Sequence, residues 1–223
     1  MLYIVQIYRS VSKTHTTTDW REARRRSARE AIVDAAWDLV HEEGLAALSL
    51  RDLARRAGIT TPTVYAYFDS KNAIYDAMFG RAATEFADWM TQPLAASEPA
   101  AVLNSHAHRF VEFCTSDVAR YQLLFQRMIP NFEPSAESYA PAVLALEVAR
   151  GCLALNGVKQ PRHLDLWTAL LSGLVDQQVS NDPGGDRWTR LIDEAVAMFL
   201  AHSRAVPQVR KPTSKSRAKG AGR

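Results

Sequence analysis

The fold of this chain is decided by residues 48–68, which read LSLRDLARRAGITTPTVYAYF. The first half has helical apolar spacing, with Leu53 on the inner face of the expected helix. Gly58 then supplies the permissive backbone that a three-residue turn needs. Val64 and Phe68 are four residues apart, so they share one face of the helix that follows. The stretch therefore predicts a helix-turn-helix.

The second helix of this motif has an outer face made of Pro62, Thr63 and Ala66, flanked by Tyr65 and Tyr67. At 1.5 Å per residue, the expected helix is only about 12 Å long. That length is enough for a few side chains to enter a major groove about 12 Å wide. The motif therefore predicts an element that contacts double-stranded DNA.

Helical periodicity is present along nearly the whole chain and strand signals are scarce, so we expect an all-α fold. Ser27 and Ser49 each begin a capping-box pattern, and Thr60 and Ser70 each stand where a helix N-cap is expected. With the turns between them, these signals predict nine helices and no sheet. Their expected ranges are roughly 28–43, 50–57, 61–68, 71–90, 98–114, 117–127, 136–155, 162–180 and 187–202.

Charge is distributed unevenly along the 223 residues, whose formal net charge is +3. Residues 1–30 carry +4 and residues 204–223 carry +7, whereas 31–80 carry −3 and 81–203 carry −5. A chain whose interior is acidic does not have the composition of a uniformly basic nucleic-acid coat protein. The positive charge at the two ends instead indicates arms beside a folded body.

Cys114 and Cys152 are the only cysteines, and they are far apart in the sequence. This excludes a disulfide scaffold and a four-thiolate zinc site, so we expect buried free thiols. His106 and His108 point about 200° apart on a helix and cannot share an ion. We therefore expect no metal and no cofactor. We also expect no membrane-spanning segment and no signal peptide, and hence a cytoplasmic protein.

Residues 28–80 resemble the DNA-binding domain of the TetR/AcrR family of transcriptional regulators. The resemblance is carried by residues 58–71, GITTPTVYAYFDSK, in which Tyr-x-Tyr-Phe-x-x-Lys follows a turn of glycine, an apolar residue and threonine. Residues 98–202 are similar to the more variable ligand-binding and dimerisation domain of that family. With the resemblance, the predicted domains are 1–26, a flexible basic arm; 27–70, the helix-turn-helix domain; 71–203, the ligand-binding and dimerisation domain; and 204–223, a disordered basic tail.

The resemblance implies a role for each residue of the DNA-binding surface. Ser49 is expected to reach a phosphate with its hydroxyl or its backbone N–H. The recognition helix is expected to meet base edges, and two tyrosines and a lysine to hold the backbone phosphates. The tyrosines could instead pack as aromatic groups, and the lysine could be a solvated helix-start residue that opposes the macrodipole. The predicted DNA-binding residues are Ser49, Arg51, Thr60, Thr61, Pro62, Thr63, Tyr65, Tyr67 and Lys71.

The groove face holds Thr, Pro and Ala, with no Arg, Asn or Gln for bidentate contacts to bases. We therefore hypothesise that sequence is read mainly through thymine methyl groups and DNA shape. Arg51 is the nearest exception, because it could reach a base from the preceding helix. The arm Arg21–Arg29 is either a solvated helix start or a minor-groove or phosphate contact. The basic tail is expected to be a solubilising or nonspecific tether.

The last two predicted helices, 162–180 and 187–202, have apolar stripes wider than packing on one neighbour requires. The resemblance implies that these eighth and ninth helices form an intermolecular four-helix bundle in a homodimer; the alternative is a core within one chain. A pocket for an effector is expected between the fifth and eighth helices. Its candidate wall residues, which could equally be plain core, are Phe110, Cys114, Tyr121, Phe125, Met128, Trp167 and Leu171.

The leading hypothesis is a sequence-specific DNA-binding transcriptional regulator, a repressor released from a pseudo-palindromic operator by a small lipophilic effector. The alternative is an architectural, weakly specific DNA-binding protein that uses its basic tails. An all-helical enzyme is the third class. Against it, the sequence has no GxSxG, P-loop, Rossmann glycines or HExxH.

Overall fold

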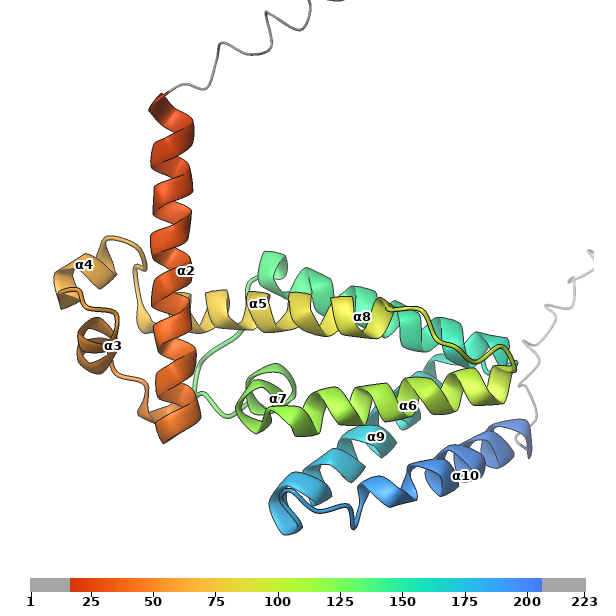
Figure 1. Cartoon of the computed structure of the whole chain (residues 1–223). Coiled ribbons are helices and arrows are strands. Elements are labelled where there is room, and N and C mark those ends of the chain that lie inside the picture. Colours follow the sequence, from red (N-terminus) through yellow and green to blue (C-terminus); the bar gives the residue numbers. More distant parts are fainter. Residues whose placement is uncertain (1–16, 206–223) are drawn as a thin grey trace, which may run out of the picture.

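The computed structural model describes residues 17–205, and that range contains nine α-helices and two 3₁₀ helices, without a strand (Figure 1). The prediction of an all-α fold is confirmed. The helices are α2 (Thr17–Glu43), α3 (Leu50–Arg56), α4 (Thr61–Tyr65), α5 (Lys71–Thr91), α6 (Pro99–Ser116), α7 (Val118–Phe125), α8 (Ala136–Leu155), α9 (Pro161–Asn181) and α10 (Ile192–Ala205). The 3₁₀ helices are η1 (Leu45–Ala47) and η2 (Thr189–Leu191).

The first helix is longer than its capping pattern predicts. It begins at Thr17 rather than at residue 28, so Ser27 lies inside α2 and does not cap it. Residues 17–26, expected to be a flexible arm, are therefore helical. Four of these ten residues are arginine, a good helix former, and the stretch has no proline or glycine, so nothing in it stops the helix. The rest of the predicted arm, residues 1–16, and the tail from residue 206 lie outside the described residues.

The predicted caps of the next three helices are confirmed. The Ser49 hydroxyl oxygen accepts from the Asp52 N–H at 3.1 Å, and that of Thr60 accepts from the Thr63 N–H at 3.3 Å. Ser70 caps α5 in the same way. Gly58, between α3 and α4, has a φ of 67°, which explains why glycine is needed in this turn. α4 ends at Tyr65, earlier than the expected end near residue 68.

The start of the last helix also differs from the prediction. A helix was expected from residue 187, but Trp188 and Thr189 lie in a 3₁₀ turn and α10 begins at Ile192. The buried side chain of Gln178 explains the difference, because its oxygen accepts from the N–H groups of Trp188 at 2.9 Å and Thr189 at 3.3 Å. Two backbone donors are thus satisfied by α9, outside a continuous helix.

The structure contains two hydrophobic cores that share helix α5. The first core lies among α2, η1, α3, α4 and the beginning of α5, where Ile74 and Met78 are fully buried. The second lies among α6 to α10 and the end of α5, where Phe86 and Met90 are buried. Figure 1 shows α5 leading from α3 and α4 into the larger bundle, where it packs along α8. The two halves are therefore joined by continuous packing.

Helix α8 is, by length and composition, apolar enough to cross a membrane, although only 22% of that stretch is buried in the fold. The expectation that no segment approaches such a length is therefore too strict. α8 packs along α5, and its exposed apolar side chains include Val143, Leu144 and Leu155.

The apolar stripes of α9 and α10 are used largely within the chain. Trp167, Leu171 and Val175 of α9 are buried, as are Val196 and Phe199 of α10. Apolar side chains also remain on the outer side of both helices. Leu166 and Met198 are exposed, and Leu170, Leu174 and Leu191 are half-buried.

Candidate nucleic-acid interface and aromatic cavity

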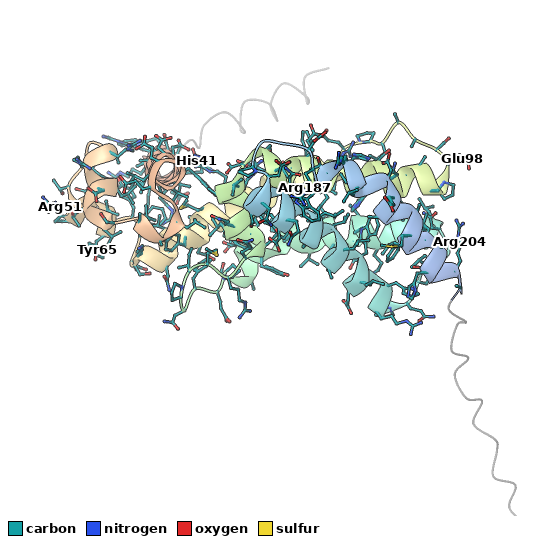
Figure 2. All side chains as sticks on the ribbon, turned by 90° about the horizontal axis from the view of Figure 1, so that it is seen from below. His41, Arg51, Tyr65, Glu98, Arg187 and Arg204 are labelled. Carbon is teal, nitrogen blue, oxygen red and sulfur yellow. The ribbon has the colours of Figure 1, made fainter. Side chains whose placement is uncertain are left out.

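Helices α3 and α4 and the turn at Gly58 form a small unit at one end of the molecule, here called the recognition unit. Leu53 and Val64 are fully buried beneath it, and Phe68 closes the core behind α4. The Ile59 N–H donates to the Ala54 carbonyl at 2.9 Å and fixes the turn between the helices. Figure 2 shows Arg51 and Tyr65 at this end of the molecule, with Arg204 at the opposite end.

The hydroxyl groups at the two helix starts are hydrogen-bonded within the unit. The Thr60 and Thr63 hydroxyls lie 2.8 Å apart. The Ser49 hydroxyl donates to the Asp52 carboxylate, and this hydrogen bond lowers the pKa of Asp52. Because the Asp52 charge faces the Ser49 hydroxyl, the free backbone N–H is the better group of Ser49 to meet a phosphate.

The outer face of α4 presents the side chains that the motif predicts for the groove. Pro62 and Ala66 are exposed, and Tyr65 is 51% exposed. Thr61 and Thr63 are half-buried at the edge of this face.

The remaining predicted contact residues surround that face. Arg51 is exposed on α3, whereas its neighbours Arg55 and Arg56 pair with Asp52 and Glu42. Tyr67 is half-buried. Lys71 is the first residue of α5, with its Nζ 5.4 Å from the centre of the Tyr75 ring.

The N-terminal extension of α2 adds basic residues beside α4. The Arg25 guanidinium lies 6.0 Å from the centre of the Tyr67 ring and donates to the Ala66 carbonyl at 3.4 Å. An open groove of about 690 Å³ lies between the two helices. It is lined by Trp20, Arg21, Arg24, Arg25, Pro62, Thr63, Ala66 and Tyr67. The arginine-rich stretch signalled this surface in the sequence, and of its two interpretations only the helix start is tested by the structure, which has it helical.

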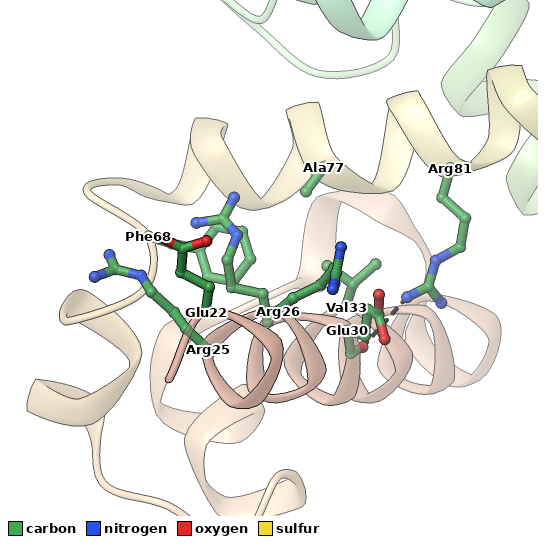
Figure 3. Close-up of a pocket in the computed structure, with 9 residues that line it drawn as sticks. Glu22, Arg25, Arg26, Glu30, Val33, Phe68, Ala77 and Arg81 are labelled. Atoms are coloured by element: carbon green, nitrogen blue, oxygen red, sulfur yellow. Dashed lines mark hydrogen bonds between the residues drawn. The ribbon is translucent and has the colours of Figure 1, made fainter. Parts of the chain in front are cut away.

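A second groove lies on the other side of this extension, between α2 and α5 (Figure 3). Arg25, Arg26 and Arg81 line it, but so do Glu22 and Glu30. Carboxylates among the guanidinium groups offset their charge, so this groove is a mixed surface rather than an anion site. Arg29 is held within it, 4.2 Å from the centre of the Phe68 ring and donating to the Tyr67 carbonyl.

The second core contains a partly open cavity of about 220 Å³, here called the aromatic cavity, lined by residues of α5, α6, α7, α8 and α9. Four of the predicted pocket residues line it: Phe110, Phe125, Trp167 and Leu171. Cys114 and Tyr121 are buried in the same core but do not line the cavity. Met128 follows the end of α7, is 52% exposed and does not line it either.

Two side chains in the cavity wall have polar atoms without a protein partner among the described residues. His106 is 3% exposed, and neither of its ring nitrogens has a hydrogen-bond partner. The Trp167 indole N–H is likewise buried and unpaired, and the two rings lie 6.3 Å apart. Burial, with the nearby Arg109 charge, lowers the pKa of His106 to about 4, so its imidazole is neutral near pH 7.

Three other titratable groups of this core, Tyr121, Asp176 and Cys114, are paired or inert. The Tyr121 hydroxyl donates to Asp176 at 2.7 Å, and Gln126 donates to the same oxygen at 2.6 Å. Burial raises the pKa of the Cys114 thiol, which is therefore protonated and unreactive. Among residues 17–205, no group of three His, Cys, Asp or Glu side chains could hold a metal ion.

With this geometry established, comparison with known proteins identifies the recognition unit. Residues 32–78 match the sequence pattern of the family of bacterial regulatory proteins described as the tetR family. This part of the chain is therefore similar to the tetR family. One curated relative is the tetracycline repressor protein class D of Escherichia coli, 42% identical over 50 residues. That alignment covers 22% of this chain and 23% of the repressor, so the sequence likeness is confined to the N-terminal domain.

The likeness of fold extends through the rest of the chain. A tetR-family transcriptional regulator from Streptomyces coelicolor has a TM-score of 0.63 at 23% identity, covering 81% of this chain and 83% of its own. The regulator FadR from Bacillus subtilis, solved in complex with stearoyl-CoA, has a TM-score of 0.59 at 17% identity. That match covers 77% of this chain and 97% of FadR. At these identities the likeness shows the fold alone.

A polar contact crosses between the two halves of the fold. His41, in the last turn of α2, lies 2.9 Å from the carboxylate of Asp117, which caps α7. Leu123 of α7 is also buried in the first core. The cavity wall and the recognition unit are therefore connected through α7 as well as through α5.

Proposed function

We propose that this chain is a transcriptional repressor that binds a pseudo-palindromic operator as a homodimer and is released by a small molecule. The exposed face of α4 in a TetR-type recognition unit carries this proposal. The aromatic cavity in the second core supports the release step, because α5 and α7 contribute to both cores. Because an operator-binding protein must have access to chromosomal DNA, we also assign this chain to the cytoplasm.

On DNA, the short α4 enters the major groove with Thr60, Thr61, Pro62 and Thr63 toward the bases. The Thr60 and Thr63 hydroxyls are paired with each other, and Pro62 has no donor, which favours contacts with thymine methyl groups and readout of DNA shape. The phosphates are held from the sides, where polar and basic groups surround this face. The proposed phosphate contacts are Ser49, Tyr65, Tyr67 and Lys71, extended by Arg21, Arg24 and Arg25 of α2.

The homodimer is formed through α9 and α10. Since most of their stripe is buried within the chain, the contact surface consists of the apolar side chains left outside, chiefly Leu166, Leu170, Leu174 and Met198. Two such helices from each chain give a four-helix bundle. The twofold axis places two recognition units about one DNA turn apart.

The effector is a small lipophilic molecule held in the aromatic cavity. The mostly apolar wall supports this class of ligand. The relative FadR, which was solved with stearoyl-CoA, has the same fold. Binding is proposed to favour an arrangement of the dimer in which the two recognition units no longer match the operator.

Operator binding is tested by selecting DNA from a random pool and measuring affinity by fluorescence anisotropy at two salt concentrations. Thr63→Ala should weaken binding at particular base pairs, by about 1–3 kcal/mol. Tyr65→Phe should weaken binding to all sequences similarly, because it removes only a phosphate contact. Thr84→Ala is the control for Thr63→Ala, since Thr84 is an exposed threonine of α5, outside the recognition unit.

The alternative, an architectural protein that binds through its basic ends, gives a different result in the same assay. Selected and scrambled DNA would then bind equally, with a steep dependence on salt. Arg51→Ala separates two modes of reading within the leading proposal. A relaxed preference at one G·C pair would indicate direct readout by Arg51, and an unchanged preference would support readout by methyl groups and shape.

A further inference from the structure

We propose that the aromatic cavity selects a compact, uncharged molecule with one hydroxyl or carbonyl group, and that His106 and Trp167 recognise that group. This inference rests on the proposed function in one respect, since it assumes that the cavity is the effector site. It goes further in assigning the size, the charge and the polar group of the ligand.

The volume of the cavity sets the size of the ligand. At about 220 Å³, it is moderately larger than a cavity of about 150 Å³ that holds a benzene molecule. A single ring with a short substituent fits this space. A long acyl chain with its coenzyme A, as found in FadR, does not. The two proteins share a fold, but this cavity requires a much smaller ligand.

The wall of the cavity favours a ring. Phe86, Phe110 and Phe125 meet edge to face, with ring centres 5.3–6.0 Å apart. These three rings come from α5, α6 and α7, so the cluster closes one side of the cavity with aromatic surface. An aromatic ligand can add to such a cluster in the same edge-to-face geometry.

The buried, unpaired polar atoms of the wall define the polar group of the ligand. Neutral His106 offers one donor and one acceptor nitrogen, and the Trp167 indole offers one donor. A buried polar group without a partner costs free energy, so a ligand that satisfies these atoms gains affinity over an apolar molecule of the same shape. A hydroxyl can both accept and donate here, and a carbonyl can accept.

The charge of the lining excludes ionic ligands. None of the residues that line the cavity is Lys, Arg, Asp or Glu. His106 does not supply a compensating positive charge, because burial and Arg109 keep it neutral near pH 7. A carboxylate would therefore lose its hydration and find no counter-charge in the wall.

The test uses the full-length protein and four probes of similar size: 1-phenylethanol, acetophenone, ethylbenzene and benzoate. Binding is measured by isothermal titration calorimetry and by the rise in melting temperature. We expect 1-phenylethanol and acetophenone to bind about tenfold more tightly than ethylbenzene, as one hydrogen bond to a buried group implies, and benzoate not to bind. Preference for benzoate, or equal binding of ethylbenzene and 1-phenylethanol, would overturn the proposal.

Variants assign the preference to His106. In His106→Leu, the advantage of the polar probes over ethylbenzene should disappear, whereas His106→Gln should keep part of it because its amide still donates and accepts. His108→Gln is the control, since His108 is exposed on the same helix and contacts Asp193 at 2.7 Å. If His106→Leu does not fold, the titration of His106→Gln decides alone. If His106→Gln binds the four probes in the same order and with the same affinities as the native chain, His106 does not have the proposed role.

A separate measurement keeps this inference distinct from the proposed function. Operator binding is titrated with the same four probes present. Failure to bind any operator would remove the proposed function and leave the ligand preference of the cavity standing. Operator binding that responds to no probe, although 1-phenylethanol occupies the cavity, would show that the cavity is not the effector site.

Discussion

The two halves of the molecule treat their buried polar atoms differently. Among the side chains that the structure describes from residue 20 to residue 103, no buried nitrogen or oxygen lacks a hydrogen-bond partner. All such atoms lie later, in α6, α7, α9, α10 and the connections after α8 and α9. They belong to Asn104, His106, Arg120, Asn156, His163, Trp167, Trp188 and Ser203.

This difference suits two kinds of recognition. In the N-terminal half, Ser49, Thr60 and Ser70 satisfy helix ends, and the recognition unit presents a fixed surface. The groups on this surface can then contact DNA without rearranging. In the C-terminal half, unpaired polar atoms raise the free energy of the empty cavity wall, and a ligand with the right group can lower it.

The largest expected effects test whether the two cores unfold together. Leu53 and Leu103 are both fully buried, one in each core. Leu53→Ala and Leu103→Ala should each lower the free energy of unfolding by about 2–5 kcal/mol. Because α5 contributes to both cores, we expect a single transition in urea, followed by circular dichroism, that both variants shift. Two transitions, each moved by only one variant, would show that the halves unfold independently.

The next effect concerns the unpaired imidazole of His106. Its pKa is about 4 in the folded protein and about 6.5 when exposed, so the unfolded chain binds more protons between these values. Stability should therefore fall as pH is lowered from about 6.5 to about 4, by roughly 3 kcal/mol from this residue. Burial lowers the pKa of His163 too, in the same direction.

The measurement is the urea midpoint as a function of pH. His106→Leu should flatten the profile between pH 6.5 and 4, and His108→Gln should leave it close to that of the native chain. An equal slope in His106→Leu and the native chain would mean that His106 is not buried in its neutral form.

These contrasts also explain what the sequence could predict. The caps at Ser49, Thr60 and Ser70 and the turn at Gly58 depend on neighbours within a few residues, so a local pattern predicts them. The same pattern at Ser27 misled, because a serine followed by a glutamate is compatible with the interior of a helix. The last helix was misplaced because Gln178, which fixes its start, belongs to another helix.

The aromatic cavity depends on long-range packing, which a local pattern does not contain. Phe110, Phe125 and Trp167 come from three helices that meet only in the folded protein. Apolar spacing predicts that such residues point inward, but not which of them leave a space between them. Met128 shows the limit of this reasoning, because the chain turns at the end of α7 and leaves its side chain exposed.

A smaller effect is expected where α5 packs on α8. A Cβ added to Gly80 would lie 3.0 Å from the Ser138 hydroxyl, which donates to Asp76 at 2.9 Å. Gly151 on α8 has open space at the same position. Gly151→Ala should raise the free energy of unfolding by up to about 1 kcal/mol, because alanine favours the helix. The change in the free energy of unfolding should be less favourable for Gly80→Ala than for Gly151→Ala, by about 1 kcal/mol or more. The reason is that Ser138 must move and lose its hydrogen bond. Equal gains in urea unfolding would show that the α5–α8 contact is loose.

The smallest expected effect is at the polar contact between the halves. Side chains as exposed as His41 form pairs worth about 1 kcal/mol or less, so His41→Gln should change stability only slightly. Asp117→Asn, which can still cap α7, completes a double-mutant cycle whose coupling energy we expect to be about 0.5 kcal/mol. If so, ligand in the cavity should still alter operator affinity in His41→Gln nearly as it does in the native chain, because the shared packing of α5 and α7 connects the two halves. Loss of the ligand response in His41→Gln, with operator affinity retained, would instead assign the connection to the contact between His41 and Asp117.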